Sequence, residues 1–390
     1  MKKKSVGIIA EYNPFHNGHL YHLNQSKKLS GAEVSVVAMS GNFLQRGQIA
    51  IADKWSRAEA AVRCGADLVV EIPVAFACNS APVFAKAGVE ILEALGVDYI
   101  SFGSESGNIH ELMDIVKLLN EKEQEIEASI RDSVKKGLSY PRARSDALIQ
   151  MIGREKARII DTSNNILALE YLKNIKKATP ITVKRSGPGY NALEASEEFA
   201  SATAIRYMME ENIEISAFMP PESIDTVRKC LKPSKDVIFR MICQQGLIKN
   251  AENLDAVSAG GEGLGNKLKN NIRYVNSLDE LVESMKTKRY TRTRIERFLT
   301  HCLLEIEDIR YENYIRILAF NKKGSAYLKN IKKNETLALP IITNINKEAK
   351  SLLNIQRTLK KDILASDIYN MASGRDLYAF SDYVIKPFTL

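Results

Sequence analysis

Two histidines, His16 and His19 in the segment His16-Asn-Gly-His19, have the spacing in this chain that points most directly to chemistry. An apolar run, Val6 to Ala10, precedes them, followed by a turn at Asn13 and the start of a helical pattern. Residues three apart share one face of a helix, at whose N-terminus backbone N–H groups favour a phosphate. The segment predicts that two imidazoles hydrogen-bond phosphoryl oxygens and stabilise the charge that develops during nucleotidyl transfer.

Gly18 lies between the two histidines, where a side chain would hold a phosphate away from the helix. His22 has the wrong spacing for the same face, and we expect it to be an ordinary residue of the helix. A pair of surface histidines beside an N-cap is the alternative interpretation. The strand before and the helix after the motif favour the phosphate site.

A second group of polar residues opens another predicted helix in Ser201-Ala-Thr203-Ala-Ile-Arg206. Two hydroxyls and a guanidinium at a helix N-terminus suit the β- and γ-phosphates of a nucleotide. Simple capping by Ser201 is the alternative. The two groups together would hold both sides of a triphosphate.

The elements that must position these side chains are short strands alternating with helices over about the first 210 residues. The expected strands are Val6 to Ala10, Val34 to Met39, Asp67 to Ile72, Val97 to Phe102 and Ile181 to Arg185. This alternation predicts an α/β fold with a Rossmann-like parallel sheet, whose ligands bind at the carboxyl ends of the strands.

A change of composition after Phe218-Met-Pro-Pro221 predicts a domain boundary. We expect the α/β domain over residues 1–220 and a mainly helical, basic domain over 221–390. The charged stretch from Glu121 to Lys136 predicts a solvated helix. The glycines of 261–265 predict an entry to a helix, because no strand precedes them as in a dinucleotide-binding loop.

Six cations surround Tyr290 between Lys286 and Arg297. Cations interleaved with an aromatic ring suit an RNA backbone and an unpaired base. The residues expected to bind RNA are Lys286, Lys288, Arg289, Arg292 and Arg294. A basic helix with a solvated face remains the alternative.

The composition is that of a globular protein, with 45% hydrophobic and 26% charged residues among 390. Its net charge of +8 suits a polyanionic partner, although many basic proteins bind no nucleic acid. The apolar runs are shorter than the roughly 20 residues of a membrane span. The five cysteines are far apart, which argues against a disulfide framework or a zinc site. We expect a cytoplasmic protein.

Blocks of residues along most of the chain resemble the HxGH-motif nucleotidyltransferase superfamily and, within it, the bacterial tRNA(Met) cytidine acetate ligase family. These blocks are Ala10-Glu-Tyr-Asn-Pro-Phe-His-Asn-Gly-His-Leu20, Met39-Ser-Gly-Asn-Phe-Leu-Gln-Arg-Gly47, Lys54-Trp-Ser-Arg57, Phe102-Gly-Ser-Glu105 and Asn164-Asn-Ile-Leu167. The four-residue histidine motif alone supports only the superfamily, whereas the ordered blocks support the ligase family.

The resemblance implies a reaction in two steps. Acetate attacks the α-phosphorus of ATP to give acetyl-adenylate and pyrophosphate. The N4 amine of the wobble cytidine, in the anticodon loop of elongator tRNA(Met), then takes the acetyl group to form N4-acetylcytidine. We expect ATP and Mg²⁺ as cofactors, with Mg²⁺ held by the phosphates and not by protein side chains. The expected partners are acetate and tRNA, with no protein partner and no membrane. The resemblance makes residues 1–220 a catalytic, ATP-binding domain of the nucleotidyltransferase type and residues 221–390 a tRNA-binding domain.

The resemblance also assigns an ATP site, in which the first strand, turn and helix are completed by Gly103, Asn164 and Arg185, with Lys184 as the alternative to Arg185. A glycine at a strand end allows close approach of a nucleoside, and an amide can read adenine or ribose edges. The expected ATP-binding residues are Gly7, Ile8, Ile9, Ala10, Glu11, Tyr12, Asn13, Pro14, Phe15, His16, Asn17, Gly18, His19, Leu20, Gly103, Asn164, Arg185, Ser201, Thr203 and Arg206.

Further cations follow the second predicted strand. Arg46 lies in a polar loop bracketed by glycines, and Lys54 and Arg57 open the next helix. We expect Arg46 and Lys54 near the ATP or acetate pocket and Arg57 on a solvated face. The candidate catalytic residues are His16, His19, Lys54 and Arg206.

Two other functions stay open from the residues alone. One is an adenylyltransferase that attaches AMP to a cofactor precursor, using the same two phosphate-binding elements. The other is a non-catalytic RNA-binding protein. The intact His16 and His19 pair argues against the second.

Overall fold

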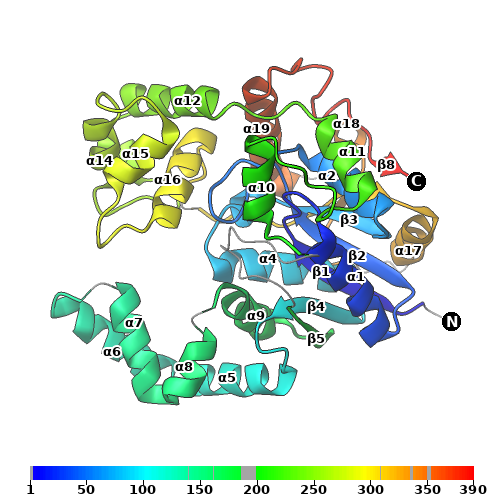
Figure 1. The fold of residues 1–390 in the computed structure, drawn as a ribbon, viewed down its shortest axis with the longest axis horizontal. Helices are drawn as coiled ribbons and strands as arrows, with labels where there is room; N and C mark the ends of the chain where they lie inside the picture. The colour runs from blue at the N-terminus through cyan, green and yellow to red at the C-terminus, as the bar shows by residue number, and fades with distance from the viewer. Residues whose placement is uncertain are drawn as a thin grey trace.

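A single sheet forms the centre of the protein in the computed structural model, which describes residues 3–138, 140–160, 162–185, 199–307, 309–333, 337–348 and 353–390 (Figure 1). Its strands are β1 (Ser5–Ala10), β2 (Val34–Ser40), β3 (Leu68–Ile72), β4 (Tyr99–Ser104), β5 (Thr179–Lys184), β6 (Ile315–Phe320), β7 (Ile341–Ile342) and β8 (Phe388–Thr389). The order is β5-β4-β1-β2-β3-β6-β7, and β8 pairs with β6. Strands β1 to β5 pair in parallel, which confirms the α/β prediction and all five expected strands.

Helices cover both faces of the sheet, which is why β2 is buried along its whole length. Val36 and Ala38 point to one face and Val37 and Met39 to the other. On the first face lie α4 (Ala81–Ala94) and α9 (Ser163–Asn174), and on the second lie α1 (Asn17–Ser30) and α2 (Lys54–Arg63). The carboxyl ends of the parallel strands remain open to a ligand.

Part of the C-terminal region returns to this sheet, and the division into domains at residues 220 and 221 remains a prediction. Strand β6 pairs antiparallel with β3, so that Leu68 faces Phe320, and β7 and β8 then pair with β6. A short apolar run such as Ile315–Phe320 fits a buried strand or a buried helix equally well by its pattern. Only its pairing with β3, far away in the sequence, decides between the two.

Most of the remaining described residues are helical. One group contains α5 (Ile109–Glu121), α6 (Glu123–Lys135), α7 (Tyr140–Ile152) and α8 (Arg154–Ile160). A second group contains α12 (Lys235–Ile248), α13 (Ala251–Asp255), α14 (Leu264–Asn271), α15 (Leu278–Met285) and α16 (Arg292–Leu304). The others are α3 (Val74–Ala77), α10 (Ala202–Glu210), α11 (Pro221–Arg228), α17 (Lys322–Lys333), α18 (Ile345–Glu348) and α19 (Gln356–Ala372). The solvated helix and the glycine-led helix entry expected from the sequence correspond to α6 and α14.

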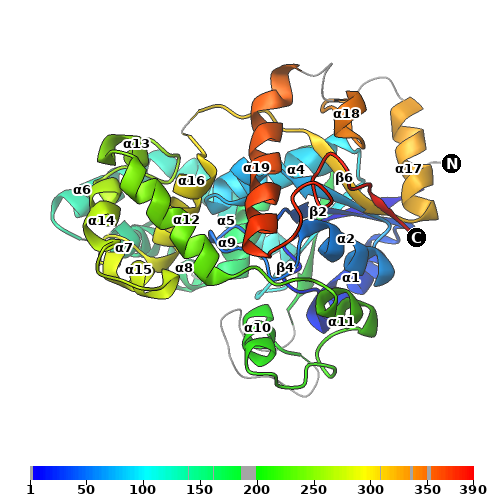
Figure 2. The same ribbon diagram turned by 90° about the horizontal axis from the view of Figure 1, so that it is seen from above.

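Both helical groups lie on the same side of the sheet (Figure 1). Helix α19 lies between the α12–α16 group and the sheet and shares a hydrophobic core with that group (Figure 2). No helix in the described part of the chain is both long and apolar enough to cross a membrane.

His301 joins α16 to Cys78 at the end of α3. Its protonation should make the free energy of unfolding depend on pH. Its Nδ1 accepts from the Ala259 N–H at 3.0 Å, and its Nε2 lies 2.6 Å from the Cys78 carbonyl oxygen, so the ring is held neutral with the proton on Nε2. Burial lowers its pKa to about 4.

Unfolded His301 would take up a proton below about pH 6.5, whereas the folded ring resists protonation. The free energy of unfolding should therefore fall as the pH drops from about 6.5 to 4, by about 3 kcal/mol from this residue alone. Chemical denaturation of the unmodified protein and of His301→Gln at several pH values measures this difference. An equal slope in both proteins over that range would contradict it.

Candidate active site

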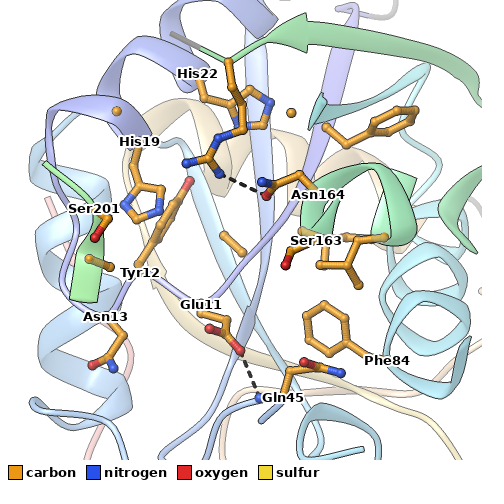
Figure 3. Close-up of a pocket in the computed structure, with 18 of the residues that line it drawn as sticks. Glu11, Tyr12, Asn13, His19, His22, Gln45, Phe84, Ser163, Asn164 and Ser201 are labelled. Carbon is orange, nitrogen blue, oxygen red and sulfur yellow. Dashed lines mark hydrogen bonds between the residues drawn. The ribbon is translucent and has the colours of Figure 1, made fainter. Parts of the chain in front are cut away.

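A cavity of about 480 Å³ lies at the carboxyl ends of β1 and β4. From β1 the chain continues to β2 and β3 on one side of this point, and then crosses back to β4 and β5 on the other side. The cavity therefore lies at the topological switch point of the sheet. Elements far apart in sequence line it together (Figure 3). The predicted residues that it brings together include His16, Gly18, His19, Arg46, Gly103, Asn164, Arg185, Ser201 and Arg206.

His16 and His19 together cap the N-terminus of α1. The Nδ1 of His16 accepts from the Gly18 N–H at 3.0 Å, and the Nδ1 of His19 accepts from the His16 N–H at 3.3 Å. The two rings are stacked with centroids 3.7 Å apart. Since each Nδ1 accepts a hydrogen bond, each neutral ring carries its proton on Nε2. Each ring therefore carries an Nε2–H donor, and the His19 ring also hydrogen-bonds the Pro14 backbone.

The electrostatic surroundings keep these rings neutral. Burial, followed by the charges of Arg185 and Arg206, lowers the pKa of His16 to about 3. Burial and the neighbouring His16 hold the pKa of His19 well below its usual value. The neutral histidines can thus serve as hydrogen-bond donors, and the positive charge of the cavity comes from its arginines and Lys184.

Gly18 is required by the histidine geometry as well as by a ligand. A Cβ at this position would lie 2.9 Å from Cε1 of His16. The expected reason, that a side chain would hold a phosphate away from the helix, remains a prediction. The close approach of the His16 ring is a reason that the sequence did not reveal.

His22 lines the cavity, in contrast to the sequence-based expectation of an ordinary helix residue. Its Nε2 lies 3.3 Å from the Ser101 Oγ, and burial, followed by Arg185, lowers its pKa to about 4. His16, His19 and His22 are spaced three apart, which keeps all three near one helix stripe over two turns. That repeat was the signal available in the sequence.

Arg206 joins the second polar group to the first. From α10 its Nη1 donates to the Asn13 carbonyl oxygen at 2.8 Å and its Nη2 donates to the Thr203 Oγ1 at 3.1 Å. Ser201 lines the cavity and also caps α10, accepting from the Ala204 N–H at 3.0 Å. Thr203 is not among the residues that line the cavity, so its contribution is to orient Arg206.

On the opposite wall, Glu105 organises the N-terminus of α9. It accepts from the Asn164 side-chain amide at 2.6 Å and from the Asn165 N–H at 2.9 Å. The Asn164 Oδ1 in turn accepts from the Arg185 Nη1 at 2.9 Å (Figure 3). Lys184 also lines the cavity, but Arg185 is the residue bonded to Asn164. Glu105 had no assigned role in the sequence, because its capping of a helix 60 residues later is a tertiary contact.

The chain matches the family described as HIGH Nucleotidyl Transferase over residues 3–379. The tRNA(Met) cytidine acetate ligase of Thermoanaerobacter sp. (strain X514) is 40% identical over an alignment of length 396, which covers 97% of this chain and 98% of that protein. The protein of the same name from Clostridium tetani is 36% identical, with 98% of each chain covered. This chain belongs to the tRNA(Met) cytidine acetate ligase family.

Solved structures of this family agree in fold. Thermotoga maritima TmcAL without ligand superposes with a TM-score of 0.91 at 32% identity, and 99% of each chain is covered. The structure of that protein bound with alpha-thio ATP superposes with a TM-score of 0.89 at 31% identity, again over 99% of each chain.

Lys54 does not reach the cavity, which corrects its expected place near ATP or acetate. It is 1% exposed, and its Nζ lies 2.9 Å from Glu71 and 2.7 Å from Asp382. Both carboxylates together outweigh burial and raise the pKa of Lys54. Lys54 is therefore a neutralised internal cation that ties the C-terminal segment to β3. Its partner Asp382 is 328 residues away in sequence, so no local pattern could show this.

Arg57 is also buried, whereas the sequence favours a solvated position. It donates to the carbonyl oxygens of Ala52 at 2.9 Å and Glu11 at 2.6 Å, and further to Ser40 and Gly41. Arg57 thereby holds the ends of β1 and β2, whose following loops line the cavity. Of the loop cations, Arg46 is the one that lines the cavity as expected.

The basic segment around Tyr290 is largely paired with acidic side chains. Arg289 and Arg294 both bind Glu262, and Arg292 binds Asp279, Glu283 and Glu296. Tyr290 is 8% exposed and donates to the Glu262 carbonyl oxygen, so it is not placed to stack on a base as the sequence suggests. RNA binding by this segment remains a prediction.

Arg297 is the residue of this segment that the sequence did not single out. It lines the cavity from α16 together with Thr293, and among the described residues it has no carboxylate partner. Burial, and to a smaller extent the charges of Arg294 and Arg46, lower the pKa of Arg297.

The donor set of the cavity does not fit a magnesium ion held by the protein. Within the described ranges, no group of three or more His, Cys, Asp or Glu side chains could hold a metal ion. Among the described residues that line the cavity, Glu11 is the one carboxylate, whereas Mg²⁺ prefers several oxygen ligands. The residues present suit a nucleotide's phosphates and not a resident metal.

Proposed function

We propose that this chain is an ATP-dependent ligase that activates acetate as acetyl-adenylate, releases pyrophosphate and transfers the acetyl group to N4 of the wobble cytidine of elongator tRNA(Met). The observation that carries the proposal is the pair of Nε2–H donors of His16 and His19, fixed at a helix N-terminus beside Arg206. The names of the similar proteins and the nucleotide in the Thermotoga structure support the same function. Such an enzyme would work in the cytoplasm.

The geometry divides the work on ATP between the two polar groups. In the first step an acetate oxygen attacks the α-phosphorus, and negative charge grows on the phosphoryl oxygens and on the leaving pyrophosphate. His16 and His19 would donate hydrogen bonds to the α-phosphoryl oxygens, while Arg206 and Ser201 would hold the β- and γ-phosphates. Arg185 and Asn164 on the opposite wall would contact the nucleoside side. Any Mg²⁺ would enter with the phosphates of ATP.

The test is to incubate the purified protein with ATP, labelled acetate and elongator tRNA(Met), and then to analyse the nucleosides. We expect labelled N4-acetylcytidine only when all three are present. Its absence under these conditions would overturn the proposal. Pyrophosphate exchange that depends on a phosphorylated metabolite instead of acetate would indicate an adenylyltransferase of a cofactor precursor.

Replacement of Arg297 by alanine should weaken tRNA binding, because this cation lines the cavity without a carboxylate to neutralise it. The loss of one phosphate contact should reduce the slope of log K for tRNA binding against the logarithm of the salt concentration by about one. Titrations of tRNA at several salt concentrations measure this slope. Lys28→Ala removes an exposed lysine at the far end of α1 and serves as the control. An equal slope in both variants would contradict a phosphate contact by Arg297.

A further inference from the structure

Glu11 is the one carboxylate among the described residues that line the cavity. It directly follows the last residue of β1 and is half-buried. Its Oε1 accepts from the Gln45 backbone N–H at 2.9 Å, and no described residue donates a hydrogen bond to its Oε2. One oxygen therefore fixes the direction of the carboxylate, and the other is available to a ligand.

The position of Glu11 separates two parts of the cavity. Figure 3 shows it between Tyr12 and Gln45, with His19 and Ser201 beyond Tyr12. The part near His19 is the phosphate end described above. Gln45 belongs to the loop that carries Arg46, and Arg46 and Arg297 line the same cavity. Glu11 thus lies between the phosphate end of the cavity and the loop that carries Gln45 and Arg46.

The second step of the proposed reaction requires an acceptor for a proton. The N4 lone pair forms a C–N bond to the acetyl carbon, the bond from that carbon to the phosphoryl oxygen breaks, and its electron pair leaves with AMP. One of the two N4 hydrogens must then leave as a proton. The histidines at the phosphate end are poor acceptors, because their Nδ1 atoms already accept hydrogen bonds and their Nε2 atoms carry protons.

We propose that Oε2 of Glu11 accepts a hydrogen bond from the N4 amine of the target cytidine and takes the proton that this amine releases. A carboxylate is the side chain that pairs with the exocyclic amine of cytosine. A uracil would instead present an oxygen acceptor to the same carboxylate, so this contact also selects cytidine over uridine. The inference rests on the proposed function.

Glu11→Gln tests this role, since glutamine has the same length and still accepts from the Gln45 N–H but cannot take a proton. The rate of acetyl transfer from acetyl-adenylate to tRNA in a single turnover should fall by about 10²-fold or more. This loss should exceed the loss of acetate-dependent ATP–pyrophosphate exchange by a factor of at least about ten. The transfer rate of the unmodified enzyme should rise with pH over the acidic limb of its pH–rate profile. Glu11→Gln should lose that limb, and Glu11→Asp should keep it.

Glu59→Gln makes the same change in a carboxylate on α2 that pairs with Arg63, and it serves as the matched control. Equal losses of exchange and transfer in Glu11→Gln, or a pH profile like that of the unmodified enzyme, would overturn the role of Glu11. If Glu11→Gln does not fold, loss of the acidic limb in Glu11→Asp would overturn it as well. Absence of exchange in the unmodified enzyme would instead overturn the proposed function.

Discussion

Replacement of His16 or His19 by alanine should lower acetyl-adenylate formation by about 10²-fold or more, the usual loss when one such transition-state donor is removed. Each alanine variant removes an Nε2–H donor proposed to stabilise the developing phosphoryl charge. Each also removes an Nδ1 acceptor that caps α1. Acetate-dependent ATP–pyrophosphate exchange measures the first effect, and thermal denaturation measures the second.

Two conservative variants separate catalysis from capping. In His16→Asn the amide oxygen can accept from the Gly18 N–H, as Nδ1 does, because asparagine is a good N-cap residue. In His19→Gln the side chain can restore the capping box to the His16 N–H. Both variants should keep their thermal stability and still lose the exchange reaction. Retained exchange in both alanine variants would defeat the assignment of these histidines.

Arg206→Met should lower kcat/KM for ATP by about 10²-fold, because it removes the guanidinium proposed to hold the β- and γ-phosphates. The physical reason also predicts which ligands should bind more weakly. Binding of ATP and pyrophosphate should weaken strongly, whereas binding of AMP should change little. Isothermal titration with the three ligands makes this comparison. Equal weakening of AMP and pyrophosphate would place Arg206 at the wrong end of the nucleotide.

Thr203→Val is the matched variant for Arg206. Thr203 accepts from the Arg206 Nη2 at 3.1 Å but is not among the residues that line the cavity. Loss of one hydrogen bond that orients the guanidinium should lower kcat/KM for ATP by only about 3- to 10-fold. An effect as large as that of Arg206→Met would mean that Thr203 itself contacts the phosphates.

The sequence by itself determined the parallel sheet and the two polar groups at helix N-termini that we propose bind the phosphates. Apolar runs that alternate with helical stretches are a local pattern, and they placed β1 to β5 correctly. The His16 and His19 spacing is also local, because both residues lie within one helical turn. The family resemblance, carried by ordered blocks of residues, added Gly103, Asn164 and Arg185, which all line the cavity.

Only the tertiary structure decided where the isolated cations and carboxylates lie. Lys54 and Arg57 open the same helix that the sequence predicts, but Asp382 and the carbonyl oxygens around Arg57 bury both of them. The acidic partners of the basic segment likewise come from residues as distant as Glu262. A charged residue shows its type in the sequence, whereas its partner is set by long-range packing. For that reason Glu11, expected from the resemblance only as part of the ATP site, became a candidate proton acceptor once its hydrogen bond to Gln45 and its place in the cavity were known.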